Sequence, residues 1–365
     1  MCTEQVTLLL CGDVMLGRGV DQILPHPGDP ALMEGYVRDA RDYVTLAEVE
    51  NGPIPSPVDF GWPWGDALAA MDEAAADARV LNLETSVTRS GRFAPGKSVH
   101  YRMNPANLPC LARARPDVCA LANNHVLDFG REGLAETLDS LDSAGLPAAG
   151  AGPDRERAWR PATVETGGGR VLVLSCGMES SGIAPHWAAA GGRSGVAFTT
   201  ERSAALILER VRRAKRAGDI VVVSVHWGSN WGYDIPDQQV RFAHALLDGG
   251  ADIVHGHSSH HPRPIEVYRG KLVLYGCGDL INDYEGIPGY GRYRDELRLL
   301  YVASVRPDSG ELAGLRMVPL RARRMRLVRA SDEDAGWLRA SLDSAGRPFG
   351  TRVGLEPDRI LTLAA

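Results

Sequence analysis

The segment ALANNHVLDFG, residues 120–130, places two amides and an imidazole directly after a short apolar run. The preceding DVCALA is typical of a buried strand. The following REGLAETLDSLDSAG repeats leucine at helical spacing and ends at Gly145. Asn123, Asn124 and His125 therefore fall where a strand passes into a helix, which is where ligands bind in open α/β sheets. A turn in which the Asn side chains satisfy their own backbone is the alternative.

Polar side chains of the same kind end five further strand-like runs. The runs are VTLLLCGD, ARVLNLE, DIVVVSVHWG, ADIVHGHSSHH and KLVLYGCGD, and their terminal polar residues are Asp13, Asn82, Glu84, His226, His255, His257, His260, His261 and Asp279. Carboxylate, amide and imidazole groups are ligands of manganese, iron(II) and zinc. Two such cations, with a carboxylate between them, can activate water and clamp both the attacking and the leaving oxygen. Convergence of the strand ends would therefore predict a hydrolytic metal site.

The elements between these runs predict a layered α/β architecture. Helical periodicity covers 65–77, 131–144, 201–217 and 237–248. Residues 24–66 are rich in proline and glycine, which favours a lid or binding loop, with a packed surface loop as the alternative. Residues 146–170 are predicted to be a connector with a hairpin.

Composition limits the possible functions. The 365 residues are 44% hydrophobic, enough for a large core, and the net charge of −6 disfavours a nucleic-acid surface. The basic run RARRMRLVR, residues 321–329, is predicted to be a solvated helix or strand edge. The N-terminal MCTEQVTLLLCGD is too short and acidic for a signal peptide, and no stretch approaches the length of a membrane span.

The cysteines predict a reducing compartment. None of the six forms a CxxC pair, and Cys11, Cys119 and Cys176 lie in or beside apolar strand-like runs. We therefore expect buried thiols and a cytoplasmic location. The remaining cysteines are Cys2, Cys110 and Cys277.

Five blocks, in this order, closely resemble the CapA family, which is linked to poly-γ-glutamate capsule synthesis. They are LLLCGDVMLGR, LNLETSVT, ALANNHVLDFGREGLAETLDSLDSAGLPAAGAG, VVVSVHWG and GADIVHGHSSHHPRPIEVYRGKLVLYGCGDLI. The family is similar to the calcineurin-like metallophosphoesterases, so the resemblance implies an α/β fold, a four-layer αββα sandwich of the metallo-dependent phosphatase type. It implies a single domain over 1–320, with halves 1–150 and 165–320 joined by the connector. Residues 321–365 would be an extension packed on it.

The resemblance also implies two divalent metal ions, manganese, iron or zinc. Glu84 stands where the superfamily has its bridging aspartate, and Asn82 would hydrogen-bond that carboxylate. Met15 stands where the superfamily has a histidine, and a thioether is a poor ligand for hard cations. We therefore expect Met15 to be a packing residue and the first metal site to be weakened. The implied metal ligands are Asp13, Glu84, Asn124, His226, His257 and His260.

A catalytic role is implied for His125, because the imidazole next to the metal-binding amide faces substrate in this superfamily. It can protonate a leaving group or stabilise charge developing on an oxygen. Asp128 would orient the ring, or alternatively cap the following helix. Asp279 stands where relatives usually carry asparagine and would supply an extra metal ligand, with a turn or helix cap as the alternative.

Other residues are candidates for contact with substrate. Anionic groups would be bound by basic side chains, for which a surface role is the alternative: Arg18, Lys97, His100 and Arg102. Three tryptophans beyond strand ends either form the bottom of a binding pocket or are ordinary partly buried aromatics: Trp187, Trp227 and Trp231. His255 and His261 are expected to be structural.

These features predict a metal-dependent hydrolase acting on a phosphoester or on a glutamyl or peptide-like amide. The alternative is a non-hydrolytic accessory or polymer-binding protein of poly-γ-glutamate synthesis, which the missing histidine at Met15 favours. A nuclease suits the superfamily but not the acidic charge. The expected partner is an anionic small-molecule or peptide-like substrate, with no nucleic acid and no membrane.

Overall fold

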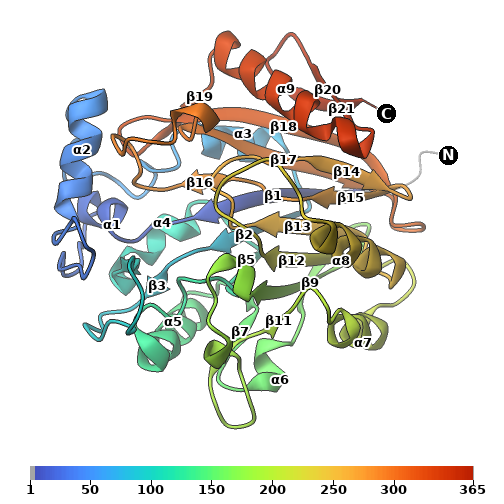
Figure 1. Cartoon of the computed structure of the whole chain (residues 1–365), viewed down its shortest axis with the longest axis horizontal. Coiled ribbons are helices and arrows are strands. Elements are labelled where there is room, and N and C mark those ends of the chain that lie inside the picture. The colour runs from blue at the N-terminus through green and yellow to red at the C-terminus, as the bar shows by residue number, and fades with distance from the viewer. Residues whose placement is uncertain (1–4, 365) are drawn as a thin grey trace.

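Strand β1, Val6–Val14, shows how the sequence builds the layers of the fold. In the computed structural model, which describes residues 5–364, Leu8 and Leu10 pack into one hydrophobic core while Leu9 and Cys11 pack into another. Successive side chains of a strand point to opposite faces, so the apolar run is buried on both sides. β1 lies near the middle of the molecule (Figure 1).

The first sheet has ten strands, in the order β20-β21-β18-β17-β1-β2-β5-β6, with β16 beside β1 and β19 beside β18. β2, β5 and β16 run parallel to their neighbours, whereas β17 is antiparallel to β1. The bounds beyond β1 are β2 Ala78–Leu83, β5 Val118–Ala120, β6 Ala148–Ala149, β16 Asp279–Ile281, β17 Leu297–Val305, β18 Leu312–Ala322, β19 Leu327–Arg329, β20 Arg352–Leu355 and β21 Leu361–Ala364.

The second sheet has seven strands, in the order β11-β9-β12-β13-β15-β14, with β8 paired to β9. Its bounds are β8 Ala162–Thr166, β9 Gly169–Met178, β11 Phe198–Thr199, β12 Ile220–His226, β13 Ile253–His257, β14 Ile265–Tyr268 and β15 Lys271–Leu274. Two short pairs complete the strands: β3 Ser86–Val87 with β4 Arg102–Met103, and β7 Ala151–Gly152 with β10 Gly195–Val196.

Helices cover the outer face of each sheet (Figure 1). The first sheet is covered by α1 Gly19–Ile23, α2 Arg41–Asn51, α3 Ala67–Glu73, α4 Leu108–Ala112 and α5 Gly130–Ser143. The second is covered by α6 Arg155–Ala158, α7 Ala205–Ala214 and α8 Asp237–Asp248. α9, Asp332–Gly346, adds Leu338 and Leu342 to the core between the sheets. The expected four-layer αββα sandwich is thus confirmed.

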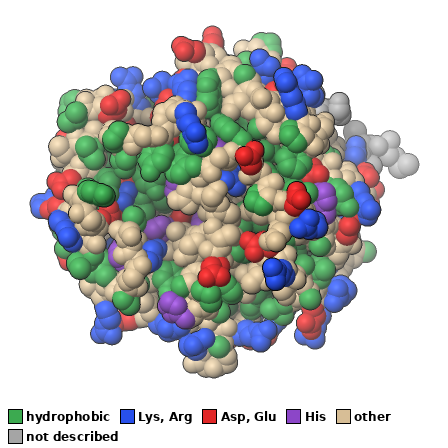
Figure 2. All heavy atoms as spheres, in the orientation of Figure 1, with side chains coloured by type: hydrophobic (Ala, Val, Ile, Leu, Met, Phe, Trp, Pro, Cys, Tyr) green, Lys and Arg blue, Asp and Glu red, His purple; other side chains and the backbone are tan. Residues whose placement is uncertain are grey.

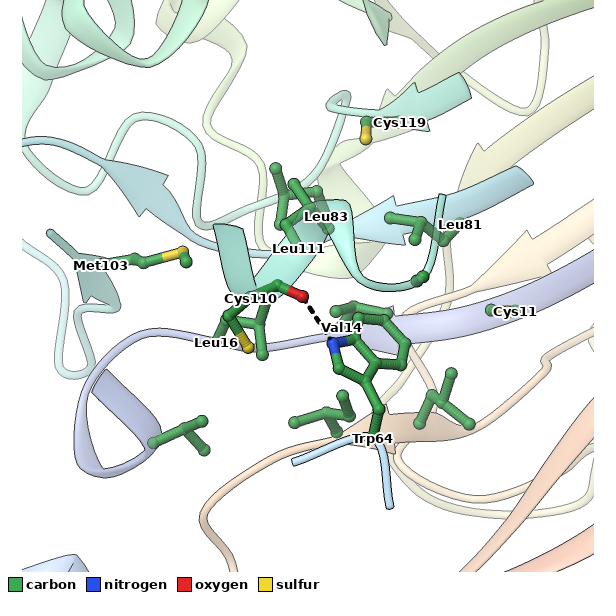
Figure 3. Packing of buried hydrophobic residues seen from close by; sticks show 14 of the residues in the cluster. Cys11, Val14, Leu16, Trp64, Leu81, Leu83, Met103, Cys110, Leu111 and Cys119 are labelled. Atoms are coloured by element: carbon green, nitrogen blue, oxygen red, sulfur yellow. Dashed lines mark hydrogen bonds between the residues drawn. The ribbon is translucent and has the colours of Figure 1, made fainter. Parts of the chain in front are cut away.

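The outer core of the first sheet is closed by Trp64, which comes from the proline-rich segment. Its indole Nε1 donates a hydrogen bond of 2.8 Å to the Cys110 carbonyl oxygen, among side chains of β1, β2 and α4 (Figure 3). Leu32, Ile54 and Val58 of the same segment are buried in this core. Much of residues 24–66 is therefore packed structure rather than a free lid.

The helical patterns are found where they were predicted, with α5 and α8 nearly matching 131–144 and 237–248 and with α3 and α7 shorter than predicted. The sequence patterns predicted none of the helices α1, α4, α6 and α9, and they also missed α2. Only Tyr43 and Ala47 of that helix are buried, so its apolar stripe is narrow. The basic run begins at the end of β18 and continues through β19, at the edge of the sheet.

The surface mixes charges of both signs over the face shown in Figure 2. Across residues 5–364, no helix has both the length and the apolar character that crossing a bilayer requires. The described cysteines are all buried and unpaired. Cys2 lies outside the described residues.

Candidate metal centre

The pleat of three strands, β12, β13 and β2, places predicted polar side chains in the layer between the sheets. In β12, Ile220 and Val222 face the inter-sheet core, so Ser224 and His226 continue along the same face. Ile253 does the same in β13, which places His255 and His257 opposite them in register. In β2, Val80 leads to Asn82 and Glu84. At the carboxyl ends of these strands, the apolar core between the sheets thus gives way to polar side chains.

We call the following buried or nearly buried residues the strand-end cluster: Asp13, Glu84, Asn124, His125, His226, His257, His260 and Asp279.

Asp13 is brought to the cluster by an irregularity in β1 at Gly12. A Cβ atom at Gly12 would lie 1.7 Å from the Gly278 carbonyl oxygen, so this close approach requires glycine. The Asp13 backbone N–H donates to that oxygen at 3.1 Å, and its carboxylate Oδ2 accepts from the Ser258 N–H at 3.2 Å. Asp13 is therefore held by both sheets.

Asn82 lies between two carboxylates of the cluster. Its Nδ2 donates to Asp13 Oδ1 at 2.8 Å and to Glu84 Oε2 at 2.9 Å. Its Oδ1 accepts from Asn123 Nδ2 at 3.0 Å. The expected hydrogen bond from Asn82 to Glu84 is present, and the same amide also holds Asp13.

Two histidines from the second sheet, His226 and His257, lie close to Asp13. The Nδ1 atoms of His226 and His257 are 2.7 Å apart, and His226 Nε2 lies 2.8 Å from Asn124 Oδ1. Ser224 Oγ is 2.9 Å from His257 Nε2 and fixes that ring. Asp13, His226 and His257 each offer a ligand atom within 4.8 Å of the other two.

A second group of ligand atoms also includes Asp13. His260 Nδ1 lies 2.9 Å from Asp279 Oδ1, and the other carboxylate oxygen of Asp279 accepts from Asn282 Nδ2 at 2.6 Å. Asp13, His260 and Asp279 again offer ligand atoms within 4.8 Å of one another. Asp279 therefore faces the cluster instead of only capping a turn.

Within the cluster, His125 has its two ring nitrogens in different surroundings. Nδ1 is 2.6 Å from Asp128 Oδ2, and Nε2 is 3.8 Å from Glu84 Oε1. Lys97 Nζ donates to the other Asp128 oxygen and to the Asn124 carbonyl oxygen, and lies 3.3 Å from His125 Nδ1. Asp128 also accepts from the Tyr101 N–H, so it orients the ring and the loop together.

The electrostatics of the cluster favour a bound cation. Burial, with Asp279 adding to it, raises the pKa of Asp13 to about 7. Burial and the neighbouring Asp13 charge raise the pKa of Glu84 well above its usual value. Burial lowers the pKa of His226 and His257 well below the usual range and that of His125 to about 4. Carboxylates crowded with neutral imidazoles are the donor set of a divalent metal site, and a cation would relieve their repulsion.

His260 differs from the other imidazoles. Burial lowers its pKa, but the charge and hydrogen bond of Asp279 outweigh burial, and the net pKa is raised.

Three of the four basic candidates for substrate binding are held elsewhere. Arg18 donates to Asp283 at 2.6 and 2.8 Å and to Glu34 at 3.0 Å, and all three side chains are buried. Arg102 donates to backbone oxygens and stacks over an aromatic ring, and His100 Nε2 lies 3.0 Å from a backbone oxygen. Of the four, Lys97 alone contacts the strand-end cluster.

The flanking histidines have structural contacts, as expected. His255 Nε2 lies 2.9 Å from the Cys11 carbonyl oxygen and links the two sheets. His261 Nε2 accepts from the Gly232 N–H, and its ring stacks on Tyr293. Met15 is fully buried, and its N–H donates to the Ile281 carbonyl oxygen.

The tryptophans divide into two kinds. Trp227 is core, since its Nε1 donates to the Tyr275 carbonyl oxygen and its ring is buried. Trp231 lies next to His260, with ring centroids 5.4 Å apart. Trp187 is buried, 5.4 Å from Lys97 Nζ.

Three residues that shape the site were not among its predicted ligands or catalytic groups, although a turn in which the Asn side chains satisfy the backbone was the stated alternative for Asn123. Asn123 accepts from the N–H groups of His125 and Val126 and thereby folds the loop that carries them. Tyr101 packs edge-on against His125 at 4.7 Å, and Tyr284 does the same against His260 at 5.1 Å. Asn123 stood in the motif itself, whereas the tyrosines lie in segments with no local signal.

The fold and the cluster define the class of the protein, an α/β sandwich with a buried set of metal-type ligands between its sheets. Residues 7–284 match the family described as "Bacterial capsule synthesis protein PGA_cap". The chain belongs to this bacterial capsule synthesis family, which confirms the resemblance to CapA proteins.

Two relatives and one solved structure illustrate the similarity. The chain is 55% identical to a "Probable polyglutamine synthesis accessory protein" of Mycobacterium tuberculosis, over 98% of this chain and 96% of the relative. It is 30% identical to "PGA biosynthesis protein CapA" of Bacillus subtilis, over 80% of this chain and 66% of that protein. A solved structure, described as a novel phosphatase from Mycoplasma pneumoniae, aligns at 11% identity with a TM-score of 0.47, over 87% of this chain and 94% of that one.

Proposed function

We propose that the protein is a metal-dependent hydrolase that acts on a phosphoester or on a glutamyl or peptide-like amide. One observation carries the proposal: Asp13 belongs to both groups of close ligand atoms, one with His226 and His257 and one with His260 and Asp279. A carboxylate shared by two groups is what two neighbouring cations need to offset their repulsion. Glu84, expected from the family resemblance to bridge, lies 3.8 Å from His226 Nε2 and stays a predicted ligand.

The residues that would hold the cations are Asp13, Glu84, Asn124, His226, His257, His260 and Asp279. When bound, divalent cations would supply Lewis acidity toward an ester or amide and toward water.

The protein's own side chains would handle protons and orientation. Asp128 accepts from His125 Nδ1, which leaves Nε2 facing the cluster. We assign proton exchange with the reacting group to that Nε2 atom. Lys97 fixes Asp128 and the Asn124 carbonyl oxygen together, so it keeps the amide and the imidazole in one arrangement.

A second candidate is a non-hydrolytic accessory function in polymer synthesis. The name of the M. tuberculosis relative, a probable polyglutamine synthesis accessory protein, favours it, as does Met15 in the place of a metal-binding histidine.

Metal analysis and one assay separate the two functions. Protein purified without chelator should contain about two metal ions per chain. With added Mn²⁺ it should hydrolyse an aryl phosphate ester, and Glu84→Ala and His125→Ala should abolish turnover. His244→Ala is the control, because His244 pairs with Glu266 outside the cluster. Protein that lacks metal and turnover but retains a polyanionic polymer would support the accessory function instead.

A further inference from the structure

The protein itself neutralises two of the arginines expected to grip an anionic substrate. The Arg18 guanidinium uses Nε and Nη2 on Asp283 and Nη1 on Glu34. Arg102 pairs with the Asp29 carboxylate at 3.4 Å and with the Asp29 backbone oxygen. Neither fork is free to bind the oxygens of a doubly charged phosphate.

Lys97 is the remaining cation, and it too has a partner. Asp128 accepts from its ammonium group, so the pair adds no net charge to the site. In the part of the chain that the structure describes, no other lysine or arginine forms a hydrogen bond or ion pair with the strand-end cluster.

The cluster therefore has a definite charge balance. Ionised Asp13, Glu84 and Asp279 bring three negative charges, and the two divalent cations of the proposed function would bring four positive ones. One positive charge is left, which a single negative charge on the substrate neutralises. A second negative charge would remain uncompensated at buried side chains, where charge is costly.

Aromatic side chains pack against two histidines of the cluster, and we call them the aromatic wall. Trp231 and Tyr284 both pack against His260, and Trp231 stacks on Tyr290 with ring centroids 4.1 Å apart and planes at 7°. Tyr101 borders His125 on the other side. Such walls suit planar or apolar substituents on the reacting group.

We propose that the centre selects phosphodiesters with planar or apolar substituents over phosphomonoesters. The inference rests on the proposed hydrolase function. Water adds its oxygen to phosphorus and one P–O bond breaks. One proton of the water leaves with the alcohol, and the other is released to solvent from the phosphomonoester, which is then doubly charged. The doubly charged product fits the charge balance less well than the substrate, which favours its release.

The test compares two esters and uses two substitutions that change the net charge of the site in opposite directions. On Mn²⁺-loaded protein, we expect kcat/KM for bis(4-nitrophenyl) phosphate to exceed that for 4-nitrophenyl phosphate by at least about tenfold, the effect of about 1.4 kcal/mol. Asp279→Asn removes one negative charge from the cluster and should lower this ratio about tenfold. Lys97→Met removes one positive charge and should raise the ratio. Asp219→Asn is the control, because Asp219 pairs with Arg170 outside the cluster.

The aromatic wall is tested with a second pair of diesters. Trp231→Ala should raise KM for the bis-aryl diester more than for methyl 4-nitrophenyl phosphate. Trp62→Ala, a tryptophan that contacts Arg324 and Arg326 instead, should raise neither. An equal rise for both diesters in Trp231→Ala would overturn the assignment of the wall.

Calorimetry gives a readout that does not depend on turnover. Metal-loaded protein should bind the monomethyl ester of phenylphosphonate more tightly than phenylphosphonate dianion, and Asp279→Asn should reverse the order. If metal is bound but the dianion binds better and the variants leave both ratios unchanged, the inference is overturned while the hydrolase proposal stands. Metal-free protein would overturn both.

Discussion

Replacing Asn82 with alanine tests whether the buried carboxylates of the cluster need a cation. Asn82 Nδ2 donates to Asp13 and Glu84 at 2.8 and 2.9 Å. A hydrogen bond to a charged group contributes about 1.5–3 kcal/mol, so at a pH high enough to ionise both carboxylates, whose pKa values are raised, losing both costs about 3–6 kcal/mol in the metal-free protein. With Mn²⁺ bound, the cation would neutralise the same carboxylates. The loss should then fall to about 1 kcal/mol, the contribution of an ordinary hydrogen bond.

The assay is urea unfolding of wild-type and Asn82→Ala protein, each in chelator and in excess Mn²⁺. Asn107→Ala is the matched control, because the buried Asn107 Nδ2 also donates to two acceptors, Asp21 Oδ1 at 2.7 Å and the His26 carbonyl oxygen at 2.9 Å. Its loss of stability should be the same in both buffers. If the Asn82→Ala loss of stability is also the same in both buffers, the reasoning is refuted. Such a result would mean that no cation neutralises the carboxylates to which Asn82 donates.

Three further perturbations follow from contacts elsewhere in the fold. Ser224→Ala frees the His257 ring and should weaken Mn²⁺ binding about 10–100-fold by calorimetry without changing the far-ultraviolet spectrum; unchanged affinity would contradict this. Burial raises the pKa of Asp219, but the hydrogen bonds from Arg170 lower it by more, so the net pKa in the folded protein is decreased. The pair therefore stabilises the fold at any pH above the ordinary Asp pKa of about 3.9. This contribution to stability is lost as the pH falls through the lower pKa of the folded state. Arg170→Met should therefore reduce the urea midpoint at neutral pH and have little effect below that range, and an equal reduction at both would count against it. Leu10→Ala removes a fully buried side chain between the sheets and should cost about 2–5 kcal/mol in urea unfolding, whereas a loss under about 1 kcal/mol would mean that this core is loosely packed.

The layers of the fold could be predicted from the sequence because strand signals and helical periodicity are local. In β12 the alternation of side chains also indicates where the site lies, because every second residue shares one face of the sheet. The residues on that face are Ile220, Val222, Ser224 and His226. A strand whose inward positions change from hydrocarbon to imidazole points to a polar site at the end of a core. The helix α2 lacks such a signal, because few of its residues are buried.

The pairings within the site could be predicted only in part. Residue types at strand ends indicated the cluster, and the structure brings those side chains together. The role of Arg18 could not be inferred, because its partner Asp283 lies 265 residues further along the chain. A basic residue near a motif has the same local signal whether it binds a ligand or a carboxylate of its own protein. Only the tertiary contacts decide between the two.

The position of β1 also has a consequence for synthesis on the ribosome. β1 pairs with β2 on one side, but its other long neighbour, β17, is made nearly 300 residues later. Asp13 lies on the early strand, and its partners His260 and Asp279 are also translated late. A nascent chain therefore holds an exposed, apolar β1 until translation is almost complete, and it cannot assemble the centre before then. Chaperone occupancy during synthesis should be longest over this interval.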